Sequence, residues 1–87
     1  MNKFIFTGNV GSNPEVIKNG CKLSICNAYW NGKESKNLWV DVLVFGQQVE
    51  SCMTYLTVGG KVLIEGRLEK GLANGKFIVI AENVEFL

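Results

Sequence analysis

The sequence predicts a small all-β domain in which five strands close into a barrel, with one helix between the third and fourth strands. Three observations favour this class. The chain has 87 residues, enough for one domain and too few for two. Short apolar runs alternate with glycine-containing turns along most of its length, as in small barrels. One interval instead repeats its apolar residues at helical spacing. We therefore expect residues 1–87 to form a single domain.

The first two strands are expected in the N-terminal third of the chain. Lys3–Thr7 is an apolar run that stops where turn residues begin. Asn19–Gly20 is a hairpin signal that precedes the second strand, expected at Lys22–Trp30. Alternation along this strand directs Leu23 and Ile25 into the core. The outward set is Ser24, Cys26, Ala28 and Trp30.

The third strand is expected at Leu38–Phe45, after a polar connection over 31–37 that should project as a mobile hairpin loop. Nearly every position of the strand is apolar, so alternation divides it into an aliphatic face and a mixed face. We assign the aliphatic face to the core, and it consists of Leu38, Val40, Val42 and Val44. The face left outside carries two aromatic rings and a carboxylate, on Trp39, Asp41, Leu43 and Phe45.

The helix and the last two strands follow. Four apolar residues have the i, i+3, i+4 and i+7 spacing of a helix that lies on a core. They are Val49, Cys52, Met53 and Leu56. Gly59 is expected to end the helix at a C′ position. The last strands are expected at Lys61–Glu69 and Lys76–Leu87, joined by a turn over 71–75, and the final strand should bend near Glu82–Asn83.

Three strands, a helix and two strands, in that order, are the elements of an OB fold, whose helix closes one end of the barrel. Closure also removes the strand edges that such apolar segments would otherwise offer to aggregation. The same pattern is compatible with an SH3-like barrel or a split sheet.

Composition excludes several classes of function. The chain contains no histidine, which removes Ser-His and Cys-His nucleophiles, and no phosphate-binding glycine motif. Cys21, Cys26 and Cys52 lack metal-ligand spacing and are interpreted as reduced small hydrophobes of a cytoplasmic protein. We expect a protein that is not an enzyme, with no metal and no cofactor; metal-assisted hydrolysis near Asp41 is the weakest alternative. No apolar run approaches the ~20 residues of a membrane span, and no signal peptide is visible.

Charge is distributed unevenly along the chain, whose net charge is +1. Residues 1–36 contain five lysines and two acids, a local balance of +3, whereas residues 37–87 contain four cations and six acids, a local balance of −2. A basic half permits contact with a phosphate backbone but does not by itself indicate one.

Two blocks of the sequence carry motifs of a known family. The first, Asn2–Glu15, reads NKFIFTGNVGSNPE and is similar to an opening in which N-K and a hydrophobic residue precede G-N-hydrophobic-G-x-D-P-E. The second, Trp39–Gly66, fits W-x5-F-G followed by Y-L-x-x-G-x-x-V-x-I-E-G without gaps. In this order and spacing the blocks resemble the bacterial and phage single-stranded-DNA-binding proteins. They cover about half of the chain, and the element order extends the similarity over nearly all of it.

The resemblance implies which residues contact DNA. Trp39 and Phe45 match positions at which the family stacks bases, and both already lie on the face that alternation leaves outside. Lys3 matches a family lysine near the first strand. Trp30, with its neighbour Tyr29, lies near the site of another stacking tryptophan. The same rings could instead be core or interface residues, since aromatics supply buried area in any fold.

Basic residues around the two hairpins are candidate phosphate contacts, because OB folds bind ligands across the second and third strands and the bordering loops. They are Lys33, Lys36, Arg67, Lys70 and Lys76. Each could also be an ordinary solvated charge. The sequence departs from the family at Asp41, where an arginine is common, and at Gln47, where a lysine is common. Leu72 is the residue nearest to the family's third tryptophan.

The function that the resemblance implies is binding of single-stranded DNA without strong sequence preference, which protects it in DNA replication, recombination and repair. It also implies a homo-oligomer, a dimer or a tetramer, that assembles through the first strand and a sheet face and is cytoplasmic and nucleoid-associated. The chain ends at Leu87 without the family's linker and acidic tip. That ending favours either a truncated chain or an alternative, a tail-less primosomal adaptor that contacts replication proteins. A third, weaker possibility is an RNA-binding OB domain.

Overall fold

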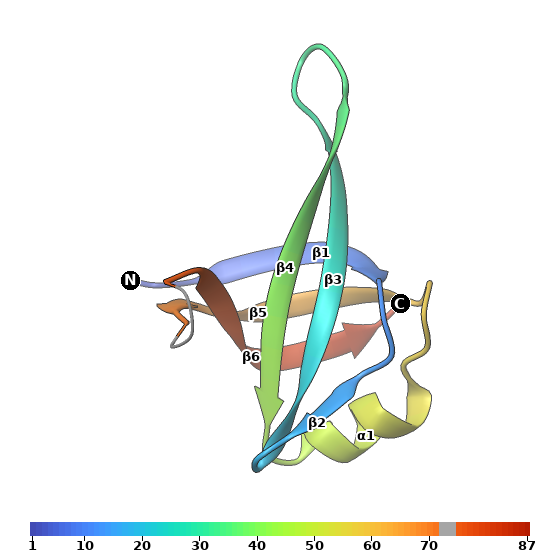
Figure 1. Ribbon diagram of the computed structural model, residues 1–87, viewed down its shortest axis with the longest axis vertical. Helices are drawn as coiled ribbons and strands as arrows, with labels where there is room; N and C mark the ends of the chain where they lie inside the picture. The colour runs from blue at the N-terminus through green and yellow to red at the C-terminus, as the bar shows by residue number, and fades with distance from the viewer. Residues whose placement is uncertain (72–74) are drawn as a thin grey trace.

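Six strands and one helix make up the computed structural model, which describes residues 1–71 and 75–87 (Figure 1). In chain order they are β1 (Phe4–Val10), β2 (Glu15–Ile17), β3 (Gly20–Trp30), β4 (Ser35–Phe45), α1 (Gln48–Tyr55), β5 (Lys61–Lys70) and β6 (Phe77–Phe86). Five strands close into a barrel in the order β1-β5-β6-β4-β3 and back to β1, and β2 pairs with β3 outside this ring. The predicted five-stranded barrel with one helix is therefore confirmed.

Two short pairings close the barrel. β1 joins β3 at Asn9 and Val10, and β4 joins β6 at Val42 and Leu43. The β4–β6 pairing is parallel, so the hairpins that precede these two strands leave the same end of the barrel. α1 follows the other end of β4 and lies at the opposite end of the barrel (Figure 1). The β3–β4 hairpin continues beyond the barrel as a two-stranded ribbon (Figure 1), and we call residues 27–38 the arm.

The core follows the predicted alternation. Leu23, Ile25 and Val42 are fully buried, and the helical segment contributes Cys52 and Leu56. The other buried hydrophobic residues are Val10, Cys21, Val40, Val44, Val62, Ile64, Val79 and Val84. Full burial of an aliphatic side chain of this size stabilises the fold by about 1.5–3 kcal/mol relative to exposure. Burial of these inward side chains therefore fixes which side chains of β3 and β4 point outward.

β6 bends where the sequence predicts a bend. Glu65 pairs with Asn83 and Gly66 pairs with Ala81. Glu82 is therefore an extra residue of β6 that has no partner on β5. A β-bulge of this kind shifts the alternation by one residue. Val79, before the bulge, and Val84, after it, are accordingly both buried. Without the bulge, two residues five positions apart would point to opposite faces of the strand.

The helix ends earlier than predicted. α1 stops at Tyr55, and Leu56 adopts an extended conformation with φ −79° and ψ 130°. Gly59 lies in the following turn with φ 90° and donates its N–H to the Val10 carbonyl at 2.8 Å. The prediction that Gly59 ends the helix is wrong. The helix ends at Tyr55, and with its extended backbone Leu56 is buried in the core. Met53, part of the predicted helix stripe, remains 36% exposed. No helix within residues 1–71 and 75–87 has the length and hydropathy to cross a membrane.

The arm corrects two further predictions. Its strands extend to Trp30 and from Ser35, so the expected loop over 31–37 is reduced to a connection over 31–34. Leu38 is 47% exposed and was wrongly assigned to the core, because it lies on the arm beyond the barrel. The short strand β2 was not predicted, since three residues are too few to show an alternating pattern.

Candidate nucleic-acid interface

Three aromatic side chains share the outer face of β3 and β4. In the register, Cys26 is opposite Trp39 and Gly20 is opposite Phe45, and directly paired residues of antiparallel strands point to one face. Trp30 lies further along the same side of β3. Trp30 is 68% exposed, Trp39 60% and Phe45 43%. We call Trp30, Trp39 and Phe45 the aromatic row, and its exposure confirms the outward assignment of these rings.

Two rings of the row lie over glycines. A Cβ atom on Gly11 would come within 2.8 Å of Cη2 of Trp39, and one on Gly20 within 2.7 Å of Cδ1 of Phe45. Gly11 donates its N–H to the Ser24 carbonyl at 2.8 Å, which ties the segment after β1 to β3. The missing side chains let both rings rest against the backbone. Rings held in this way lose less conformational freedom when a ligand stacks on them.

A lysine and a carboxylate lie between the two inner rings. Nζ of Lys22 and Oδ2 of Asp41 are 3.9 Å apart, and both side chains are partly exposed. Exposed ion pairs contribute about 0–1 kcal/mol, so this one opens easily. Asp41 nevertheless offsets the charge of Lys22 in the middle of the row. Lys22 was not among the residues predicted from the sequence, although alternation places it on the outward side of β3.

All three cysteines are free thiols. Cys21 and Cys52 are fully buried. Burial raises the pKa of both thiols, and that of Cys52 reaches about 11. Cys26 differs because it is only partly buried and lies opposite Trp39 on the outer face. Within the described residues, no three His, Cys, Asp or Glu side chains are grouped so that they could hold a metal ion.

The tip of the arm is a tight polar turn. Oδ1 of Asn31 accepts the N–H groups of Lys33 and Glu34, each at 2.9 Å. Asn31 donates its own N–H to the Glu34 carbonyl at 3.1 Å, and Gly32 has φ 97°. Nζ of Lys36 lies 3.0 Å from Oε1 of Glu34. The predicted mobile loop is thus a hydrogen-bonded turn that presents Lys33 at the end of the arm.

Tyr29 and Lys36 lie on the other face of the arm. They are opposite each other in the register. Each is an even number of positions from a buried residue of its own strand, Ile25 or Val40, so both side chains point to the inner side. The structure therefore separates both of them from the aromatic row, even though Tyr29 is adjacent to Trp30 in the sequence.

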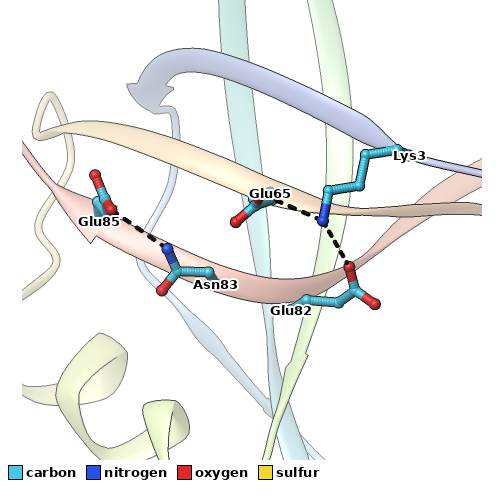
Figure 2. Close-up of polar contacts among 5 residues, drawn as sticks. All are labelled: Lys3, Glu65, Glu82, Asn83 and Glu85. Atoms are coloured by element: carbon cyan, nitrogen blue, oxygen red, sulfur yellow. Dashed lines mark hydrogen bonds and ion pairs between the residues drawn. The ribbon is translucent and has the colours of Figure 1, made fainter.

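Lys3 and Arg67 lie on a third surface, formed by the outer faces of β1, β5 and β6. Nζ of Lys3 is 3.2 Å from a carboxylate oxygen of Glu65 and 3.5 Å from one of Glu82 (Figure 2). The hydrogen bond to Glu65 is the main reason that the pKa of Lys3 is raised. Arg67 donates its Nε–H to Glu69 at 2.5 Å. Carboxylates outnumber cations on this surface, so its geometry gives no support to phosphate contacts there, and those two contacts stay predictions.

The β5–β6 hairpin carries the remaining predicted cations. Lys70 ends β5 and is opposite Phe77, the first residue of β6. The carbonyl of Lys76 accepts the N–H of Gly71 at 2.6 Å. Phe77 is 68% exposed, and it was not among the residues predicted from the sequence. Leu72 lies outside the described residues.

Comparison with known proteins identifies relatives of the chain. The single-strand binding protein family matches residues 1–87. Two proteins named single-stranded DNA-binding protein, from Neisseria meningitidis serogroups A and B, are each 30% identical to the chain over 86 residues. These alignments cover 87% of the chain and 49% of each relative, so the chain spans about half the length of these curated relatives.

A solved structure described as a Plasmodium falciparum SSB complex with ssDNA has the same fold. It matches with a TM-score of 0.82 and 24% sequence identity, over 100% of this chain and 95% of that one. At this identity the likeness establishes the barrel architecture and not the ligand.

Proposed function

Because the chain belongs to the single-strand binding protein family, we propose that it binds single-stranded DNA, without strong sequence preference, on the outer face of β3 and β4. The observation that carries the proposal is the aromatic row, three exposed rings on the outer face of β3 and β4. Every base has a flat π face, so stacking contributes about 1–3 kcal/mol per base whatever the sequence. Trp39 and Phe45 are the central stacking positions, and Trp30 extends the row along the arm.

Few cations accompany the rings. Lys22 lies within the row but is paired with Asp41, and Lys33 lies at the tip of the arm. Each phosphate neutralised by the protein adds about 0.7 to the dependence of log affinity on log salt for single strands. We therefore expect a modest salt dependence, on the order of two to four phosphates per domain. A much steeper dependence would indicate a basic surface created by assembly.

This binding would protect exposed single strands during replication, recombination and repair, by association and not by a chemical step. The lack of histidine supports a binding role, since the most common general base is missing. The names of the Neisseria relatives and the DNA in the Plasmodium complex support single-stranded DNA as the ligand. They do not favour the primosomal adaptor alternative.

Two copies are expected to pair along β1. Within the described residues, residues 4–6 pair with β5 on one side, whereas β1 meets β3 at Asn9 and Val10. The start of β1 is thus an edge, which is a template for another strand. Ile5 on this segment is 58% exposed and would be covered by the pairing. Sedimentation should show a dimer or a tetramer, and a monomer at micromolar concentration would contradict this assembly.

The proposed function is tested by the anisotropy of labelled oligonucleotides at two salt concentrations. Oligo-dT should bind saturably and more weakly at the higher salt, whereas duplex DNA of the same length should bind poorly. An oligo-rU of equal length tests the RNA alternative, because a site that reads the 2′-hydroxyl should prefer RNA. No binding of oligo-dT at low salt would overturn the proposal.

A further inference from the structure

The arm projects from the barrel with little support (Figure 1). Every residue from Ala28 to Leu38 is exposed, whereas Asn27, the first residue of the arm, is partly buried. The pairing of β1 with β3 ends at Cys26, and that of β4 with β6 comes no nearer to the arm than Val42. Among the described residues, the two strands beyond these points pair only with each other. The arm therefore has no packed core of its own to fix its direction.

One side chain ties the base of the arm to the barrel. Nδ2 of Asn27 donates a hydrogen bond to the carbonyl of Thr7 on β1 at 2.7 Å. Within residues 1–71 and 75–87, no other side-chain hydrogen bond or ion pair joins the arm to the barrel. The bond lies just past the last pair of the β1–β3 ladder, Asn9 with Cys26. We call the bond between Asn27 and Thr7 the clasp.

A glycine brings β1 close enough for the clasp. Gly8, next to Thr7, is buried. A Cβ atom on Gly8 would come within 2.6 Å of both the Cys26 carbonyl oxygen and Cγ2 of Ile25. A larger residue would push β1 away from β3 at the point where the arm begins. The lack of a side chain at Gly8 therefore lets the Thr7 carbonyl approach Asn27.

We propose that Asn27 is a positioning residue for DNA binding, which holds the arm, through the clasp, at the angle that keeps Trp30 in line with Trp39. This inference rests on the proposed function. At a strand rise of about 3.3 Å per residue, Trp30 lies about 10 Å beyond Asn27. A pivot of about 20° at the base of the arm would move the ring by about 3.4 Å, the spacing of successive nucleotides along a stacked strand. The angle of the arm thus decides whether Trp30 continues the aromatic row.

The chemistry of the clasp suits a fixed support. Its donor is an amide and its acceptor a carbonyl, so salt does not screen the bond as it would an ion pair. Binding side chains need hydrogen bonds of this kind to stay within about 10–20° of the productive geometry. When the arm is already in place, less conformational freedom is lost as a base stacks on Trp30. The clasp therefore contributes to affinity although Asn27 itself need not touch the DNA.

The first test measures the arm without DNA. In Trp39→Phe, Trp30 is the only tryptophan, so the anisotropy decay of its emission reports motion of the arm. Adding Asn27→Ala should increase the amplitude of nanosecond motion, the fast end of loop dynamics. Leu38→Ala is the matched control and should leave the decay unchanged, because Leu38 is directly opposite Asn27 but lies outside the clasp. An unchanged decay in Asn27→Ala, or an equal change in the control, would overturn the inference.

Affinity gives an independent readout. Asn27→Ala should weaken binding of an oligo-dT that spans the aromatic row by about 2- to 12-fold, the affinity equivalent of one hydrogen bond. The salt slope should not change, because no phosphate contact is lost. Asn27→Asp keeps the size of the side chain but removes the donor, and it should bind no better than Asn27→Ala.

A double-mutant cycle distinguishes positioning from a general effect on the fold. If the clasp acts through the ring of Trp30, Asn27→Ala should cause no further loss of affinity in Trp30→Ala. Equal losses with and without Trp30 would contradict the inference, because the effect would then not pass through this ring.

The unaltered protein tests the proposed function separately. If it binds oligo-dT and Asn27→Ala binds equally well, the inference fails and the proposed function stands. If the unaltered protein does not bind oligo-dT, the proposed function fails and the role of Asn27 in binding fails with it. The anisotropy decay of Trp30 still shows in that case whether the clasp holds the arm, so the two failures are distinguishable.

Discussion

The six-membered ring of Trp39 rests directly against the backbone of Gly11, so closely that a Cβ atom on Gly11 would overlap it. The contact joins the segment after β1 to the middle of β4. Gly11 is not among the glycines with positive φ, so its backbone would accept an alanine. The glycine is therefore needed for the position of the Trp39 ring and not for the turn.

Gly11→Ala should consequently weaken DNA binding without unfolding the protein. The new methyl group displaces the ring of Trp39, and the loss should approach that of one stacked base, about 1–3 kcal/mol or roughly 5- to 150-fold in affinity. The measurement is oligo-dT affinity together with the free energy of unfolding. Ser12→Ala, at the exposed neighbouring position, is the control and should bind normally. Normal binding by Gly11→Ala would show that the position of this ring does not matter.

Asp41→Asn should strengthen binding. It removes the carboxylate that offsets Lys22 and frees the ammonium group for a phosphate. Because one more counterion is released, the salt slope should steepen by about 0.7. Glu85→Gln, which removes a carboxylate from β6, on the opposite side of the barrel ring from β3, is the matched control. If both variants gain affinity equally, general charge rather than the aromatic row is responsible.

Cys26 should report occupancy of the row. It is opposite Trp39 and only partly buried, whereas Cys21 and Cys52 are fully buried. A maleimide should therefore label Cys26 first, the label should block oligo-dT binding, and bound oligo-dT should slow the labelling. Cys26→Ala should bind DNA and resist the label. Labelling at an unchanged rate in saturating oligo-dT would place the DNA elsewhere.

Stability should fall as the pH rises from 9 toward 11. Burial is the main cause that raises the pKa of Cys52 from 9.0 to about 11, and it also raises that of Cys21. In this window the unfolded thiols lose protons that the folded protein retains, so the free energy of unfolding decreases with pH, by about 1.4 kcal/mol per unit of pKa difference. The decrease is measured by urea denaturation at several pH values. Cys52→Ala should show a shallower decrease than the unaltered protein, and an equal slope would contradict the assignment.

Much of the fold was predictable because alternation and burial agree wherever a strand lies on the barrel. Leu23, Ile25 and Val42 were assigned correctly for this reason. Leu38 was not, because alternation tells which face a residue occupies but not whether anything covers that face. The end of α1 was also predicted wrongly, since it depends on where Leu56 meets the core.

The site was predictable in part. Trp39 and Phe45 were found from strand parity and from motif together. The pairing of Lys22 with Asp41 depends on the register between two strands, which their individual patterns do not fix. The contact of Gly11 with Trp39 spans 28 positions of the sequence and leaves no local signal. Contacts of this kind require the tertiary structure.

The most direct measurement of the central claim is the emission of Trp39 during a titration with oligo-dT. In Trp30→Phe, Trp39 is the only tryptophan, so its fluorescence reports the middle of the aromatic row alone. We expect strong, saturable quenching that follows the binding curve obtained from the anisotropy of the labelled oligomer. Full binding by anisotropy with unchanged Trp39 emission would contradict the account, because the DNA would then lie on another surface of the barrel.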